Sequence, residues 1–148
     1  MKQSIQYFDD HFNLYPLWLS PMAIFDNDGH LGFVHPLWKT DDTEDEMYVD
    51  IGAYGTPFKE NFDNSSALPL LEKFVMDHHG YQALYAKTTL SREDFRTMFD
   101  HTDYDKLREQ LPFCKQAFDE VYDKVSSKGR VSPVEMRKLK NNSEFGAQ

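Results

Sequence analysis

The first part of the chain carries apolar side chains at helical spacing, followed by an extended apolar stretch. Ile5, Phe8 and Phe12 lie three and four residues apart and form one stripe, which predicts a helix over residues 2–12. Residues 14–25 are also rich in apolar side chains, but two prolines interrupt them. Because proline cannot donate to a strand ladder, we expect this stretch to be an edge strand or a bulged one.

A regular alternation indicates the clearest strand of the chain. Val49, Ile51 and Ala53 alternate with polar or aromatic positions over residues 47–55, which predicts a strand with one buried face. Residues 81–90 are expected to form a third strand. The three strands would pair as one antiparallel sheet.

Capping residues predict where the helices begin and end. Ser65 or Ser66 can cap a helix that runs to about His79, and Gly80 is expected to end it in the C′ position. Ser91 has an acidic residue three positions later, which is the spacing of a capping box at the start of the next helix. Two more helical stretches are predicted, over residues 104–110 and 113–126.

This order of elements predicts an α+β fold. Helix, strand, strand, helix and strand, followed by further helices, is best satisfied by an antiparallel sheet with helices on one face. The arrangement is part of a ferredoxin-like αββαβ unit with C-terminal helices added. We expect one domain over residues 1–126 and a polar, basic, partly disordered tail over residues 127–148.

The strand alternation also predicts which side chains are left for function. If the apolar set faces the helices, the opposite face is aromatic and charged. It comprises Trp18, Tyr48, Asp50, Tyr54, Tyr85 and Lys87. Tyr and Trp bury apolar area while keeping a polar group, so this face suits either a ligand wall or packing against another domain.

Composition and charge narrow the possible partners. A net charge of −9 disfavours nucleic acid, since phosphate binding needs clustered cations. Cys114 is the only cysteine, so an internal disulfide is excluded.

No apolar run approaches the roughly 20 residues that span a bilayer, and we expect a soluble segment. His78 and His79 point apart at a helix end, so no metal site is expected. The basic tail beyond Lys124 is either solvated or a weak contact for calmodulin or acidic lipid.

Eight segments together resemble one enzyme family. They are LYPLWLSP at 14–21, MYVDIGAYG at 47–55, LEKFV at 71–75, HGYQ at 79–82, SREDF at 91–95, MFD at 98–100, YDKLR at 104–108 and AFDEVYDKV at 117–125. In this order and spacing they resemble the Δ24-sterol reductases (Diminuto/Dwarf type) of the FAD-linked, vanillyl-alcohol-oxidase-type oxidoreductases. The resemblance covers about residues 1–125.

The resemblance implies a function that this chain serves only in part. In the family, an N-terminal domain binds FAD and a C-terminal cap covers the flavin and shapes the sterol pocket. The implied reaction is the NADPH-dependent reduction of the sterol side-chain C24=C25 bond, at the endoplasmic reticulum membrane. The chain resembles only the cap, so its implied partners are the sterol and the missing FAD-binding domain. We expect the isolated chain to bind no FAD and to be inactive.

The resemblance also implies site residues. Tyr48-Val49-Asp50 and Tyr85-Ala86-Lys87 resemble flavin-facing segments of decaprenylphosphoryl-ribose oxidase, a more distant relative. Tyr48 and Lys87 are therefore implied as catalytic and cofactor-binding residues, although animal sterol reductases carry an acid where this chain has Lys87. The expected substrate-binding residues are Trp18, Tyr54 and His35. Two alternatives stay open: the cap of a sugar or polyol oxidase of the same superfamily, and a non-catalytic interaction module.

Overall fold

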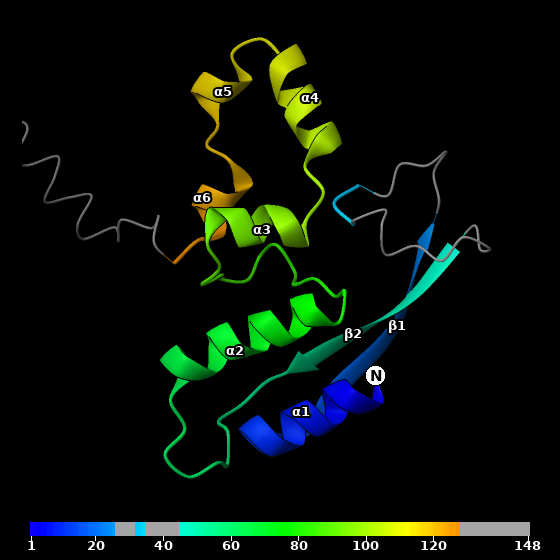
Figure 1. Cartoon of the computed structure of the whole chain (residues 1–148), viewed down its shortest axis with the longest axis vertical. Coiled ribbons are helices and arrows are strands. Elements are labelled where there is room, and N and C mark those ends of the chain that lie inside the picture. Colours follow the sequence, from blue (N-terminus) through cyan, green and yellow to red (C-terminus); the bar gives the residue numbers. More distant parts are fainter. Residues whose placement is uncertain (26–31, 35–44, 128–148) are drawn as a thin grey trace, which may run out of the picture.

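The structure is a computed structural model that describes residues 1–25, 32–34 and 45–127. Its elements in chain order are α1 (Lys2–Phe12), β1 (Leu17–Phe25), β2 (Asp45–Ala53), α2 (Asn64–Asp77), α3 (Arg92–Met98), α4 (Thr102–Gln110), α5 (Cys114–Ala117) and α6 (Val121–Val125). The chain is thus a mixed α/β structure with an antiparallel sheet, as predicted in outline. Along the longest axis, α1 lies at one end and the α4–α5 hairpin at the other (Figure 1).

The N-terminal helix has the predicted bounds and packs through its aromatic side chains. α1 ends at Asn13, whose left-handed backbone lets its N–H reach the carbonyls of Phe8 and Asp9. The rings of Tyr7 in α1 and Phe74 in α2 stack with centroids 4.2 Å apart. These contacts join two helices that are distant in sequence.

The sheet has two strands in the described part of the chain. β1 and β2 are antiparallel, with Leu17 opposite Ala53 and Leu19 opposite Ile51. Val49, Ile51 and Ala53 are half-buried on one face. A two-stranded sheet is only marginally stable alone, so its position depends on contacts with the rest of the molecule.

The predicted third strand is wrong. Within residues 81–90, only Thr88 forms a bridge, and this bridge is parallel and pairs with Ser126 rather than with the sheet. Two sets of contacts keep this segment out of the sheet. The side chains of Tyr81 and Leu84 pack against the helical core, and a turn follows in which the Ala86 N–H donates to the Ala83 carbonyl.

The second helix has different ends from those predicted. Asp63, not Ser65 or Ser66, is its N-cap, and the Asp63 carboxylate accepts the N–H groups of both serines. At the other end the left-handed position belongs to His79 (φ 56°), one residue before the expected Gly80. The Gly80 N–H donates to the Val75 carbonyl at 2.8 Å, which completes a Schellman motif.

The predicted cap at the next helix is confirmed. Ser91 is the N-cap of α3, and its Oγ accepts the Asp94 N–H at 3.0 Å. The Ser91 hydroxyl in turn donates to the Asp94 carboxylate. Ser91 and Asp94 therefore fix the start of the helix that carries the most deeply buried side chains.

The predicted helix over residues 113–126 is broken in the structure. α5 ends at Ala117 and α6 starts only at Val121. The Arg108 guanidinium donates to the carbonyls of Phe118 and Asp119, which a continuous helix would use for its own hydrogen bonds. This side chain from α4 therefore stabilises the interruption.

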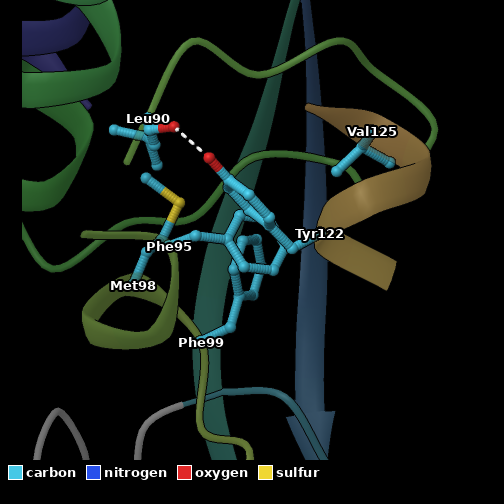
Figure 2. Packing of buried hydrophobic residues seen from close by; sticks show 6 residues of the cluster. All are labelled: Leu90, Phe95, Met98, Phe99, Tyr122 and Val125. Carbon is cyan, nitrogen blue, oxygen red and sulfur yellow. Dashed lines mark hydrogen bonds between the residues drawn. The ribbon is translucent and has the colours of Figure 1, made fainter. Parts of the chain in front are cut away.

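The main core lies between α3, α6 and the segment that joins α2 to α3. It consists of Leu90, Phe95, Met98, Phe99, Tyr122 and Val125 (Figure 2). Phe95 and Met98 are fully buried. The Tyr122 hydroxyl donates to the Leu90 carbonyl at 3.0 Å, which satisfies the one polar group inserted into this apolar cluster.

A buried carboxylate connects α2 to the same core. Glu72 is only 2% exposed. It accepts hydrogen bonds from the Thr88 hydroxyl at 2.7 Å, from the Thr89 N–H at 3.0 Å and from the Thr89 hydroxyl. Burying a carboxylate costs free energy unless it is hydrogen-bonded, so these three donors offset that cost and fix the position of the Glu72 side chain.

Candidate functional site

The candidate site lies on the face of the sheet that carries Trp18. In the antiparallel pair, Trp18 is opposite Gly52 and Ser20 is opposite Asp50. Directly opposite residues point to the same side of a sheet, so these four share one face. A Cβ built on Gly52 would lie 3.2 Å from Tyr54 Cε2 and 3.3 Å from Trp18 Cβ. The ring of Tyr54 therefore lies over Gly52, beside Trp18.

Tyr85 joins this face from the segment that follows α2. Its side chain is hydrogen-bonded to that of Tyr54, and this bond raises the pKa of Tyr85 above its ordinary value of 10.0, with a further contribution from the Asp50 carboxylate. Trp18, Tyr54 and Tyr85 are 65%, 76% and 83% exposed. These three side chains form the aromatic platform, an exposed aromatic surface with hydroxyl groups and a carboxylate at its edge.

Tyr48 lies on the same strand face but far from the aromatic platform. Its ring centroid is 5.8 Å from that of Tyr81, which in turn lies 6.2 Å from Phe99 in the core. Burial, and then the Asp50 charge, raise the pKa of Tyr81. The Cα atoms of Tyr48 and Tyr54 are six positions apart along the chain, which is at most about 20 Å at about 3.3 Å per residue. Tyr48 is half-buried and contacts the helical core, whereas Tyr54 is open to solvent.

The structure places neither Lys87 nor His35 on this face of the sheet. Lys87 is exposed, and it belongs to the segment that does not form the third strand, so strand alternation no longer places it on the sheet face. It makes no ion pair with the residues that the structure describes. His35 lies outside the described residues. The structure thus brings together Trp18, Tyr54 and Tyr85.

Two residues of this region were not predicted from the sequence. Gly52 determines how closely Tyr54 and Trp18 approach the strand, and Tyr81 connects the sheet to the core. A glycine inside a strand often marks a close approach of another group, so the position of Gly52 was a usable signal. Nothing in the local pattern around Tyr81 indicated its contact with Tyr48, because the two residues are distant in sequence.

The described residues do not form a flavin site of their own. A cavity of about 260 Å³ lies between α2 and α3, and its charged lining residues are Glu72, Lys73, Asp77 and Asp94. The three carboxylates outnumber the single ammonium group and would repel the phosphates of a dinucleotide. Among residues 1–25, 32–34 and 45–127 there is also no group of three or more side chains suited to hold a metal ion. The aromatic platform is the surface that these residues offer to a larger site.

None of the helices in the described part of the chain is both long and apolar enough to cross a bilayer.

Comparison with known proteins connects the chain to one enzyme name. It is 45% identical over 130 residues to the Delta(24)-sterol reductase of Mus musculus, which is 88% of this chain and 24% of that protein. The Homo sapiens Delta(24)-sterol reductase is 42% identical over the same length, and that of Arabidopsis thaliana is 31% identical over 144 residues. No protein-family model and no solved structure matches the chain.

The similarity covers most of this chain but only part of each relative. The chain spans about a quarter of the length of these curated relatives. The identity is spread over 88% of the chain, so it reaches both the sheet with the aromatic platform and most of the helical region. The chain is homologous to part of the Delta(24)-sterol reductases, and through them to a family of oxidoreductases.

Proposed function

We propose that the chain is the C-terminal, substrate-side part of a Δ24-sterol reductase, which reduces the C24=C25 bond of a sterol side chain with NADPH. The observation that carries the proposal is the 42–45% identity to mammalian Delta(24)-sterol reductases over 88% of the chain. These relatives are named for a sterol substrate, which favours a sterol over the sugar or polyol alternative. The longer protein would act at the endoplasmic reticulum membrane.

The aromatic platform is the proposed sterol-binding surface. Trp18 and Tyr54 are exposed, lie side by side and present large apolar ring faces. A sterol is almost entirely hydrocarbon, and aromatic side chains bury apolar area well while their polar groups stay hydrogen-bonded. His35, which precedes Pro36, is proposed as a further residue that lines the substrate pocket.

Tyr48 and Lys87 are proposed to face the cofactor region of the complete enzyme. FAD and NADPH are the cofactors that the family implies, and FAD would be held mainly by a domain outside this chain. When bound, the flavin supplies the hydride chemistry. The part of this chain would be to contribute a cation at Lys87 and a phenol at Tyr48, and to bind the substrate.

A chimera tests the proposed function directly. The matched 130 residues of the Mus musculus reductase are replaced by those of this chain, and conversion of a Δ24-sterol to its reduced product is followed by mass spectrometry. We expect NADPH-dependent reduction, because the chain supplies the homologous substrate side. A chimera that folds and carries flavin, yet leaves the sterol unreduced, would contradict the proposal.

The two proposed cofactor-side residues can be separated in the same chimera. Lys87→Ala should lower turnover while the free energy of unfolding changes by less than about 0.5 kcal/mol, as is usual for exposed positions. Tyr48→Phe removes only a hydroxyl and should lower turnover without altering the apparent affinity for the sterol. Lys59→Ala is the matched control, since Lys59 is an exposed lysine whose ammonium donates to the Asp10 carbonyl, away from this face. Wild-type turnover in both variants would remove these residues from the site.

The isolated chain gives an independent check. We expect the purified chain of 148 residues to be colourless, because the described residues form no dinucleotide site. Absorption spectra before and after incubation with FAD measure this. Stoichiometric flavin in the purified chain would mean that the division of roles between this chain and the FAD-binding domain is wrong.

A further inference from the structure

We propose that Gly52 is a specificity-determining position of the sterol-binding surface, because its missing side chain leaves room for the Tyr54 ring to lie against the strand beside Trp18, where both side chains can contact the hydrocarbon rings of the sterol. The inference rests on the proposed function and goes further, since it names the position that shapes the surface. Gly52 lies near the end of β2, one position before Ala53, and directly opposite Trp18.

The steric argument starts from the two atoms nearest to Gly52. A Cβ at this position would lie 3.2 Å from Tyr54 Cε2 and 3.3 Å from Trp18 Cβ, both closer than ordinary van der Waals contact. Any larger residue would therefore push the Tyr54 ring outward or shift Trp18. The Tyr54 ring can lie this close to the strand, beside Trp18, because residue 52 has no side chain.

A displaced Tyr54 ring would also disturb its interaction with Tyr85, which belongs to the segment after α2. The hydrogen bond between these two side chains is a cause of the raised pKa of Tyr85. Because both rings are exposed, this bond opposes a movement of Tyr54 without preventing it. The open space at Gly52 and the interaction with Tyr85 therefore both favour the observed position of Tyr54.

The chemistry of the aromatic platform favours a sterol over other ligands. Exposed aromatic faces pack well against flat alicyclic hydrocarbon, and the phenol groups at the edge can hydrogen-bond a single hydroxyl. The exposed Asp50 carboxylate next to them disfavours phosphorylated ligands through charge repulsion. A sterol combines a large apolar surface with one hydroxyl group, which is the same distribution.

Binding to the chain itself tests the inference. The chain has two tryptophans, Trp18 and Trp38, so Trp38→Phe leaves Trp18 as the only fluorophore of this type. A sterol with a C24=C25 bond, delivered from cyclodextrin, is titrated against this protein with Gly, Ala or Val at position 52. We expect saturable binding with Gly52, a Kd about threefold to tenfold higher for Gly52→Ala, and a larger loss for Gly52→Val, as displaced rotamers imply.

Stability separates this role from a merely structural one. Alanine is more favourable than glycine within a strand, but a Cβ at position 52 is strained against Tyr54 and Trp18, so the two effects oppose each other. Gly52→Ala should therefore change the thermal midpoint little while binding falls. Met47→Ala, on the opposite face of the same strand and also exposed, is the matched control and should leave Kd unchanged. Loss of binding in proportion to loss of stability would overturn the inference.

The remaining outcomes distinguish the inference from the proposed function. Equal Kd values for Gly, Ala and Val at position 52, or no saturable binding by the chain with Gly52, would overturn the inference. The inference would also be overturned if Gly52→Val left the Kd for the sterol unchanged and weakened only the association of this chain with the remaining part of the Mus musculus reductase. A chimera that binds sterol in a Gly52-dependent way but does not reduce it would instead contradict the proposed function and leave the inference standing.

Discussion

The helical core and the two-stranded sheet use aromatic side chains in opposite ways. In the core, Phe95 and Phe99 are at most 1% exposed and contact each other, and Phe95 also contacts Tyr122. On the sheet, Trp18 and Tyr54 are mostly exposed although they are just as large. The same residue types therefore stabilise the fold in one region and remain available for binding in the other.

This difference arises from the elements that cover each region. The core is enclosed by α3, α6 and the segment before α3, and α2 is tied to it through buried Glu72. The sheet has only two strands in the described part of the chain, and one face carries Gly52, where a larger residue would fill the space under Tyr54. Stability should thus depend mainly on the core, and function mainly on the sheet.

The largest expected effect comes from the centre of the core. Phe95→Ala should lower the free energy of unfolding by about 3–5 kcal/mol, because it removes a fully buried ring and leaves a cavity. Trp18→Ala is the matched control and should change it by less than about 0.5 kcal/mol, because the Trp18 ring is exposed. Urea denaturation followed by circular dichroism measures both. Equal losses would mean that the sheet is as tightly packed as the core.

A smaller effect is expected where α2 is tied to the core. Glu72→Ala leaves the donors of Thr88 and Thr89 without their acceptor, which should cost about 1–3 kcal/mol. Glu72→Gln keeps the shape and one acceptor oxygen, so its loss should be smaller. The comparison is made by thermal and urea denaturation of the three proteins. If alanine were tolerated better than glutamine, the hydrogen bonds of Glu72 would not stabilise the fold.

Removing one buried hydroxyl should have a still smaller effect. Tyr122→Phe deletes the hydrogen bond to the Leu90 carbonyl but keeps the ring, so the expected loss is about 0.5–1.5 kcal/mol. Tyr104→Phe is a useful comparison, since its hydroxyl accepts the Val121 N–H in a more open place and should cost less. Denaturation curves that show no loss for Tyr122→Phe would contradict the role of this bond.

Local signals predicted much of this structure because they describe interactions between near neighbours. The stripe of α1 and the cap at Ser91 depend on residues three or four positions apart, and both are found in the structure. The alternation around Ile51 likewise predicted β2. Within the candidate site, the exposure of Trp18 and Tyr54 could be expected from strand alternation.

The wrong predictions concern interactions between distant residues. The Thr88 N–H donates to the Val125 carbonyl, and this pairing across 37 positions replaces the expected third strand. Arg108 similarly interrupts the helix expected over residues 113–126 by donating to carbonyls ten and eleven positions later. Tyr85 reaches the aromatic platform through Tyr54 although its segment is no strand. No periodicity in the sequence indicates such contacts.

The smallest expected effect on stability, and the most specific one, concerns the hydroxyl pair of the platform. The hydrogen bond with Tyr54 raises the pKa of Tyr85 above 10.0. The folded chain therefore holds the Tyr85 proton more tightly than the unfolded chain does. The resulting contribution to stability is fully present below pH 10 and is lost as the pH rises through the higher folded-state pKa.

Tyr54→Phe should remove this bond and lower the pKa of Tyr85 towards its ordinary value, while the thermal midpoint at neutral pH changes little because both rings are exposed. The titration of Tyr85 is followed by NMR of ring-labelled tyrosine between neutral and strongly alkaline pH. Tyr15→Phe is the matched control: Tyr15 is bonded to Asp9 on another part of the surface, so the Tyr85 titration should stay as in the unmodified chain. An unchanged Tyr85 pKa in Tyr54→Phe would mean that the two hydroxyls do not interact in solution. Tyr54 would then lack its lateral support, and Gly52→Ala should have little effect on sterol binding.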